Sequence, residues 1–498
     1  MTARARGWRV VAALAAMVAP ACARTETREP LQLRPLTKTE LTPAEIKYGA
    51  SPRREPRITY QRDVILVTGG AETIRWMGAD GLTCTIDAHA PHADEIAVDK
   101  IAFVSAHCVG RVLAATREGD DLRLVLAPVE LTDVFRDLHV TVNGPIDVEA
   151  ALEYPAPQFT GTVYPLEGDG ARFPDPPPPG QIELARAAAA AESRFYVRPA
   201  AWSPIQGPQG LPAAPGIPQR LDLSFHATEP LDKTFGPGIA LAHDSNGLRL
   251  IAQFQVQMAR PNVNCLISVT AGGIDHAHFI LKNAAAIKVA FDAAANRDFS
   301  RNVSLFMPGL SLDIPVGVTG LSIAFRHGVW LDTNIAARTS LFSAGGVYRL
   351  DLNLGLRYAQ RELRPVVPAG LTVEQDLFRN MSGVSVGATG LRLGHTLSVT
   401  AGIGALGFTA GPSVNLHTQF QIGRGPTITL VQCRDVAVAV GVDAGLGWSI
   451  PGPIADFANE FLRLIGVRPI ANHGTLVKTG TVWPFNRRVQ SAAPACRS

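Results

Sequence analysis

The chain has 498 residues, a length that favours about two to four domains. Its 46 Lys and Arg nearly balance its 43 Asp and Glu, and the net charge of +3 argues against a dedicated nucleic-acid binder. Charged residues make up only 18%, against about 25% in typical soluble domains, and hydrophobic residues make up 46%. The hydrophobic fraction is therefore high enough to form large apolar cores, and it excludes a chain that is disordered over most of its length.

Residues 1–23 have the layout of a secretory signal peptide. An arginine-rich start precedes the apolar run at residues 10–18, and residues 19–21 supply an A-x-A cleavage site. The run is shorter than the about 20 apolar residues needed to span a bilayer. Cleavage before Cys22 makes it a lipidation candidate and gives membrane association, whereas cleavage before Arg24 gives free secretion. Both alternatives stay open, and the mass of the mature N-terminus distinguishes them.

The cysteines fit an exported protein, because disulfides persist in oxidising compartments. Cys84 and Cys108 lie close together within one region and are the first predicted disulfide. Cys265 with Cys433 is a weaker second suggestion, which leaves Cys496 unassigned. No C-x-x-C pair occurs, so zinc-ribbon and thioredoxin-like chemistry is not indicated.

In chain order, a polar, proline-containing lead-in at 24–57 precedes a predicted small β-domain at 58–150. Short apolar runs alternate there with turn residues, and residues 118–121 indicate a hairpin. Residues 151–220 form a Pro- and Ala-rich connector, in which the Ala-rich stretch 182–193 predicts a short helix.

The remainder predicts a large antiparallel β-domain at 221–483, followed by a tail at 484–498. Apolar and polar residues alternate at 248–258, 350–358 and 436–443, and Asn246-Gly247 and Gly345-Gly346 predict hairpin turns. Residues 454–465 have helical spacing and predict one packed amphipathic helix. The fold class is therefore mainly β, with a sandwich-like or roll-like C-terminal domain that we expect to fold alone.

Two enzyme motifs occur without the context that their chemistry needs. Residues 383–387 match G-x-S-x-G and residues 402–407 match G-x-G-x-x-G, but neither is followed by a helix-forming sequence. We therefore expect no cofactor and no catalytic residue from them, and regard an enzyme as the less favoured reading.

Two groups of residues could hold a metal ion. His276 and His278 share one face of a predicted strand, although structural histidines are the commoner case. A second group of potential ligands lies in one polar loop: Asp87, His89, His92, Asp94 and Glu95. A solvated loop is the simpler interpretation of the second group.

These observations favour an exported envelope protein, periplasmic, outer-membrane-associated or extracellular. Its expected role is that of a non-catalytic binding or structural module that accommodates an apolar ligand, with lipid or another envelope component as partner. A metal-dependent hydrolase and an outer-membrane β-barrel are the alternatives, the latter because alternating strands also occur in such barrels.

Overall fold

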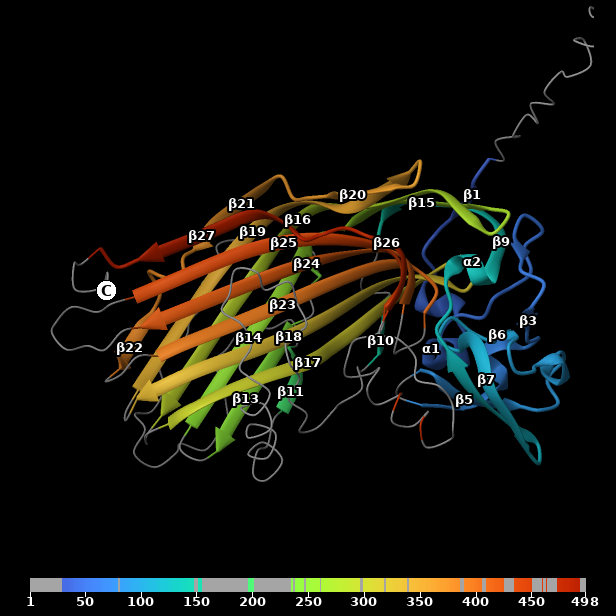
Figure 1. The fold of residues 1–498 in the computed structure, drawn as a ribbon, viewed down its shortest axis with the longest axis horizontal. Coiled ribbons are helices and arrows are strands. Elements are labelled where there is room, and N and C mark those ends of the chain that lie inside the picture. The colour runs from blue at the N-terminus through green and yellow to red at the C-terminus, as the bar shows by residue number, and fades with distance from the viewer. Residues whose placement is uncertain are drawn as a thin grey trace, which may run out of the picture. The chain divides into compact units, whose positions relative to one another are not determined.

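The computed structural model describes residues 29–78, 81–146, 151–154, 196–200, 234–235, 238–245, 248–259, 261–295, 299–317, 319–337, 340–385, 389–404, 409–424, 434–449, 459, 463 and 473–492. Contacts group the chain into Met1–Pro30 and one compact unit, Leu31–Ser498, to which all features below belong. This unit is mainly β, as the sequence predicts, with two large sheets and one small sheet (Figure 1). No helix among the described residues is long and apolar enough to cross a membrane.

The small sheet has the strand order β3-β6-β7-β8-β5-β4. Its strands are β3 (Val64–Leu66), β4 (Ile74–Met77), β5 (Thr83–Asp87), β6 (Ile101–Phe103), β7 (Val109–Glu118) and β8 (Asp121–Ala127). The predicted hairpin at 118–121 is confirmed, because Glu118 pairs with Asp121 across a two-residue turn in which Gly119 has a φ of +63°. The β3–β6 pair is parallel, and the others are antiparallel.

The predicted disulfide between Cys84 and Cys108 is confirmed in this region. Cys84 lies on β5, and Cys108 lies immediately before β7. Both cysteines are buried in a small apolar core of their own, so the bond fixes the turn before β7 against the opposite half of the sheet.

Short helices flank this sheet: η1 (Lys38–Glu40), α1 (Pro43–Tyr48), η2 (Gly70–Thr73), η3 (Ala93–Glu95) and α2 (Leu131–Val134). Thr42 begins α1 because its hydroxyl accepts the backbone N–H of Glu45 at 3.2 Å, while the Glu45 carboxylate accepts the N–H of Thr42 at 3.1 Å. After α1, Gly49 has a φ of +86°, and a Cβ there would meet His107 at 3.0 Å. Glycine thus allows the end of α1 to approach the turn before β7 closely.

The first large sheet has 13 strands in the described residues. They are β1 (Leu31–Leu33), β2 (Thr59–Tyr60), β9 (Phe135–Pro145), β11 (Tyr196–Ala200), β12 (Thr234–Phe235), β13 (Gly238–Ser245), β14 (Leu248–Ala259), β15 (Asn262–Thr270), β16 (Gly273–Ala295), β19 (Ser340–Ala359), β20 (Glu362–Val366), β21 (Gly370–Gln375) and β22 (Ser382–Ser385). The long strand β16 pairs with β19 on one side and with β15 and then β14 on the other.

The second large sheet has eight strands in the described residues. They are β10 (Leu152–Tyr154), β17 (Phe299–Val316), β18 (Leu321–Ala337), β23 (Thr389–Gly402), β24 (Thr409–Arg424), β25 (Arg434–Ser449), β26 (His473–Lys478) and β27 (Val482–Gln490). The main path runs β10-β17-β18-β23-β24-β25-β26, and β27 also pairs with β25.

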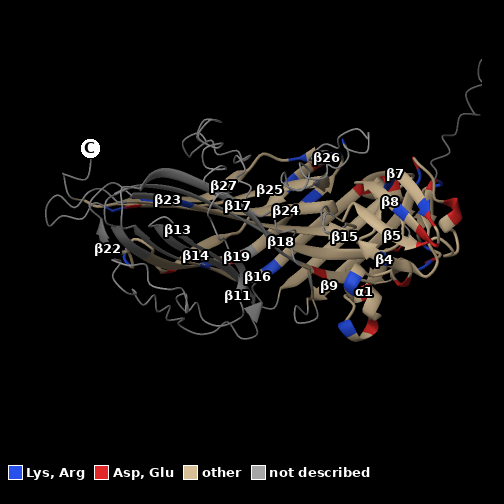
Figure 2. Ribbon diagram, turned by 90° about the horizontal axis from the view of Figure 1, so that it is seen from below, with Lys and Arg blue, Asp and Glu red and all other residues tan. Residues whose placement is uncertain are grey.

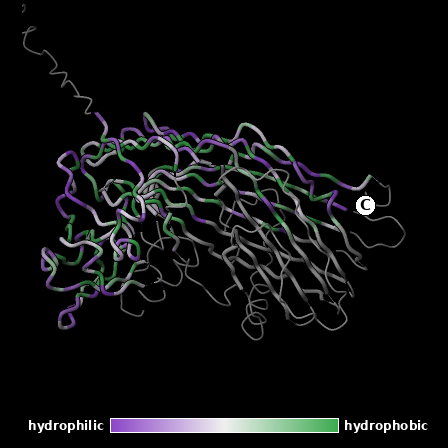
Figure 3. Tube along the Cα trace, turned by 180° about the vertical axis from the view of Figure 1, so that it is seen from behind, coloured by the Kyte–Doolittle hydropathy of each residue, from purple (hydrophilic) through white to green (hydrophobic). Residues whose placement is uncertain are grey.

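The predicted alternation is seen on β19, whereas on β25 all residues of 436–443 except Ala437 are buried. On β19, Leu350, Leu354 and Leu356 are buried while Asp351 and Asn353 are exposed. The strands on either side of Asn246-Gly247 form the predicted hairpin, since Ser245 pairs with Leu248. Figure 3 shows hydrophobic and hydrophilic positions interspersed along the described strands.

The turn predicted at Gly345-Gly346 is wrong. Both glycines lie inside β19 and pair with Ala290 and Val289 of β16. A Cβ at Gly346 would lie 2.8 Å from the ring of Tyr348, so the missing side chain makes room for this buried aromatic ring. Gly-Gly therefore serves packing here and not chain reversal.

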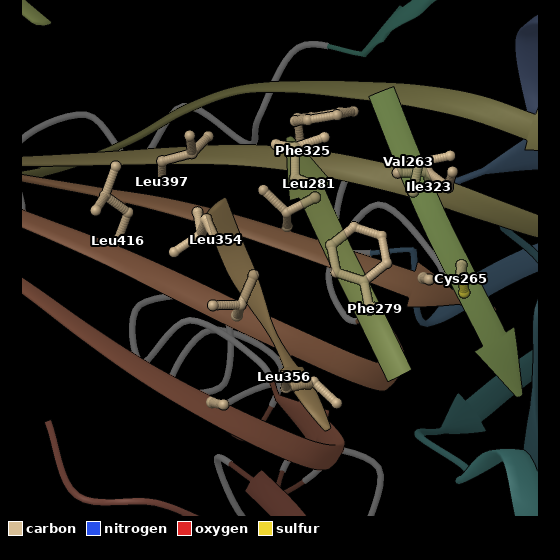
Figure 4. Close-up of a cluster of buried hydrophobic side chains, with 14 of the residues drawn as sticks. Val263, Cys265, Phe279, Leu281, Ile323, Phe325, Leu354, Leu356, Leu397 and Leu416 are labelled. Carbon is tan, nitrogen blue, oxygen red and sulfur yellow. The ribbon is translucent and has the colours of Figure 1, made fainter. Parts of the chain in front are cut away.

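The main core lies between the two large sheets (Figure 4). Side chains of β15, β16 and β19, among them Val263, Phe279 and Leu354, meet side chains of β18, β23 and β24. Phe325 and Leu416 on the second sheet are fully buried in this contact. In the part shown, the space between the sheets is filled by apolar side chains.

The predicted regions 58–150 and 221–483 share the first large sheet, and the start of the predicted connector 151–220 adds a strand to the second. Strand β9 pairs antiparallel with β15 over eight residue pairs, and β10 pairs with β17. The helix predicted at 182–193 lies outside the described residues. Of the helix predicted at 454–465, only Asn459 and Arg463 are described, and both are helical.

Candidate functional site

An open groove of about 510 Å³ lies beside the small sheet. One wall is the segment before and within β2, and the other is the whole of β3, joined by the loop that ends in η3. Its lining residues are Arg54, Glu55, Pro56, Ile58, Tyr60, Val64, Ile65, Leu66, His92 and Glu95. Apolar walls with a few charged groups at the rim are typical of small-molecule sites.

Strand β3 reaches the groove because it is the last strand of the small sheet. The N–H of Ile101 donates to the carbonyl of Asp63 at 2.9 Å, and the N–H of Val67 donates to the carbonyl of Phe103 at 3.3 Å. The odd-numbered residues in and beside β3 thus make main-chain hydrogen bonds to β6. The N–H and C=O of the even-numbered Leu66 therefore point away from β6.

Tyr60 lines the groove and carries an unpaired polar group. Its ring packs against Phe103 and Phe135, with centroids 6.3 and 5.3 Å away. Its hydroxyl oxygen is buried and has no hydrogen-bond partner among the described residues. Burial raises the pKa of this hydroxyl to about 12, so it is protonated at neutral pH and available as a donor. A buried polar group left unpaired costs about 1–3 kcal/mol, and a ligand that accepts this hydrogen bond recovers part of that cost.

The rim of the groove carries charges of both signs. His92 Nδ1 lies 2.7 Å from Glu95 Oε1, and His92 has a φ of +71°. Glu55 pairs with Arg57 at 3.2 Å, while Arg54 is exposed. Figure 2 shows that charged positions gather on the small-sheet region, whereas the described parts of the large sheets carry few.

The predicted ligand loop separates into two parts. Asp87 accepts the backbone N–H of His89 at 2.8 Å and pairs with Arg75 at 3.1 Å, and these contacts, in that order, hold the pKa of Asp87 below its usual value. Only His92 and Glu95 line the groove, and Asp94 is exposed. Within the described ranges, no three His, Cys, Asp or Glu side chains are grouped to hold a metal ion.

The predicted histidine pair lies on β16. His278 is hydrogen-bonded through Nε2 to the Asn264 side chain, and burial, followed by the charge of Arg357, lowers the pKa of His278. His276 is exposed and lies opposite Ser268 and Ala359. Among the described residues, no third potential metal ligand accompanies this histidine pair.

A polar cluster that the sequence analysis missed lies on the second large sheet. Thr396 Oγ1 is 3.1 Å from His417 Nδ1, and His417 Nε2 is 2.5 Å from Asp443 Oδ2. Asn415 donates to Asp443 Oδ1 at 2.7 Å. We call these four residues the outer polar cluster. Asn415 and His417 alternate with buried apolar residues of β24, so the strand pattern could have marked these two as lying on the outer face, but not the four residues as neighbours.

A second imidazole–carboxylate pair is fully buried. His107 Nε2 lies 2.7 Å from Asp313 Oδ2, and the ring of His107 meets Tyr154 edge-on with centroids 4.3 Å apart. His107 precedes the disulfide cysteine Cys108, while Asp313 lies on β17. The pair therefore joins the small-sheet region to the second large sheet.

The other cysteine predictions involve residues that lie mostly outside the described part of the chain. Cys265 is a free, buried thiol on β15, and burial raises its pKa to about 12. Cys433, suggested as its partner, lies outside the described residues, as do Cys22 and Cys496.

The fold and groove define a β-rich protein with a small pocketed sheet attached to a two-sheet core. Residues 208–478, more than half of the chain, match the family described as Domain of unknown function (DUF8402), and the chain belongs to that family. Residues 44–137, which contain the groove, match a second family, Domain of unknown function (DUF8403). No curated protein and no solved structure matches the chain.

Proposed function

We propose that the protein is an exported binding module that holds a small amphiphilic, lipid-like molecule in the groove between β2 and β3. The observation that carries the proposal is the groove itself, which is lined by apolar side chains and by Tyr60, whose buried hydroxyl has no partner among the described residues. Its volume falls within the roughly 300–1,000 Å³ common for small-molecule sites. The two large sheets then act as the scaffold that supports this site.

The groove chemistry favours a ligand with an apolar body and an uncharged or zwitterionic head. Ile58, Val64 and Leu66 offer apolar contact, and the Tyr60 hydroxyl can donate to a carbonyl or ester oxygen. Rim charges of both signs, Arg54 and Glu95, give no preference for a fully anionic or cationic head. Export is supported by the Cys84–Cys108 disulfide, which is typical of oxidising compartments.

The test uses the full chain with N-phenyl-1-naphthylamine as a fluorescent apolar probe, displaced by a lysophosphatidylcholine. Leu66→Gln should weaken probe binding roughly tenfold, because removing a buried leucine contact costs more than about 1.4 kcal/mol. Tyr60→Phe should spare the probe but weaken the lysolipid, which alone carries an ester acceptor.

Trp76→Gln provides the matched control, because Trp76 is an exposed apolar residue on β4, the opposite edge of the same sheet. It should leave both affinities unchanged. Equal binding by the wild type and all three variants, or no probe binding at all, contradicts the proposal.

A further inference from the structure

The outer polar cluster occupies one cross-strand row and part of the next on the second large sheet. Thr396 on β23 pairs directly with His417 on β24, and His417 pairs with Gly441 on β25. Asp443 pairs with Asn415 in the adjacent row. Figure 1 shows β18, β23, β24 and β25 side by side, so three neighbouring strands supply a hydroxyl, an imidazole and a carboxylate in series.

We propose that Thr396, His417 and Asp443 form a nucleophilic centre that hydrolyses small carboxylic esters. This activity is separate from ligand binding in the groove. The warrant is geometric: a hydroxyl within reach of an imidazole, which a third group orients, is the arrangement that activates a nucleophile. Both ring nitrogens of His417 are engaged, one by each partner.

The reaction balances with water as the only co-reactant. As Thr396 Oγ1 attacks the ester carbonyl carbon, its proton passes to His417 Nδ1, and the C–O bond to the alcohol breaks as that proton passes to the leaving oxygen. Water then attacks the acyl-threonine, gives a proton to His417, and releases the acid as that proton returns to Thr396 Oγ1. Asp443 orients the ring and stabilises the imidazolium.

Asp443 is suited to that role because it is buried yet well hydrogen-bonded. Burial acts to raise the pKa of Asp443, but the hydrogen bond and charge of His417, the hydrogen bond from Asn415 and the charge of Lys478 outweigh it and hold the pKa below its usual value. The carboxylate is thus ionised and fixed in place before any substrate arrives. Thr481 adds a further, longer contact to the same oxygen at 3.5 Å.

In its cross-strand row, Thr396 has no neighbouring side chain on the β18 side. Thr396 pairs with Gly328 on β18, and His417 pairs with Gly441, where a Cβ would lie 2.8 Å from the ring of Trp483. Trp483 therefore covers the β25 side of His417, while the β18 side of Thr396 is flanked by glycine.

A fluorophosphonate probe tests the centre in the full-length chain, because a nucleophilic hydroxyl forms an Oγ–P bond as fluoride leaves. Intact mass should show one adduct, and peptide mapping should place it on Thr396. Thr396→Val should abolish labelling, whereas Thr396→Ser should retain it. His417→Gln and Asp443→Asn should slow both labelling and p-nitrophenyl acetate hydrolysis at least about 100-fold.

Ser398→Ala is the matched control, since Ser398 lies on the same strand and face, two residues from Thr396. It should leave labelling unchanged. Circular dichroism and the melting temperature establish that each variant is folded. If a His417 variant unfolds, the comparison of Thr396→Val with Thr396→Ser still tests whether Thr396 is the nucleophile. An adduct elsewhere, an unchanged rate in His417→Gln, or no labelling of the wild type overturns the proposal.

Discussion

His107 and Asp313 show how a single pair of side chains connects two parts of this protein. Side-chain exposure is 1% for His107 and 4% for Asp313, so neither group has bulk water to compensate for lost hydrogen bonds. The Tyr154 ring packs edge-on against the imidazole of His107, and the disulfide of Cys108 fixes the turn that carries His107. Removing one member of such a pair leaves the other buried without that partner, which costs more than losing a surface ion pair.

We predict that His107→Leu lowers the free energy of unfolding by about 3–5 kcal/mol, because the Asp313 carboxylate stays buried without its imidazole partner. The double variant His107→Leu, Asp313→Asn should recover part of that loss. Arg364→Ala is the control, since it breaks an exposed pair with Glu362 and should change the free energy of unfolding little. Urea unfolding measures all three, and equal losses for His107→Leu and Arg364→Ala would falsify the assignment.

At the scale of strands, the sequence predicts which residues alternate but not which strands become neighbours. The leucines of β19 and the hairpin around residues 246–247 followed from local pattern and turn chemistry. The turn predicted at Gly345-Gly346 was wrong because the local pattern does not reveal that the Tyr348 ring occupies the space of a side chain at Gly346.

The candidate sites depend on long-range register. Thr396, His417 and Asp443 come from three strands and meet only through the pairings of β23, β24 and β25. In the groove, His92 and Glu95 stood out as polar loop residues, but Tyr60 and Leu66 resemble ordinary strand residues. Leu66 lines the groove because β3 is the edge strand of the small sheet, and Tyr60 lines it from β2, which pairs with β9, and no local pattern encodes either placement.

The disulfide is the covalent link within the small sheet, and its loss should be measurable. We predict that Cys84→Ser, Cys108→Ser lowers stability by about 3 kcal/mol, because the bond closes a 24-residue separation that is otherwise free in the unfolded chain. Thermal unfolding with and without dithiothreitol measures the effect, and the reductant should change the variant little. Free thiols at both positions in non-reducing peptide maps of native protein would contradict the bond.

At the scale of the whole molecule, the two matched families do not correspond to two separately packed bodies. The segment 44–137 ends inside β9, and β9 completes the first large sheet beside β15, which belongs to the segment 208–478. Contacts accordingly group Leu31–Ser498 as one unit. The sequence suggested a boundary at the proline-rich connector, but strand pairing crosses that boundary in both large sheets.

This pairing changes what we expect of the C-terminal part alone. A fragment of residues 196–492 lacks β1, β9 and β10, so it exposes the edge of β15, whose inward residues include Val263 and Ile267. An unpaired apolar edge favours association with other chains, so we predict aggregation or a broad, non-cooperative melt in detergent-free buffer. Co-expression with residues 29–154 restores the missing strands and should give a 1:1 complex that melts cooperatively, although residues 1–28, 155–195 and 493–498 are omitted. Size-exclusion chromatography with light scattering and calorimetry test both statements. A monodisperse 196–492 fragment that melts at the temperature of the complex would show that β9 and β10 are dispensable.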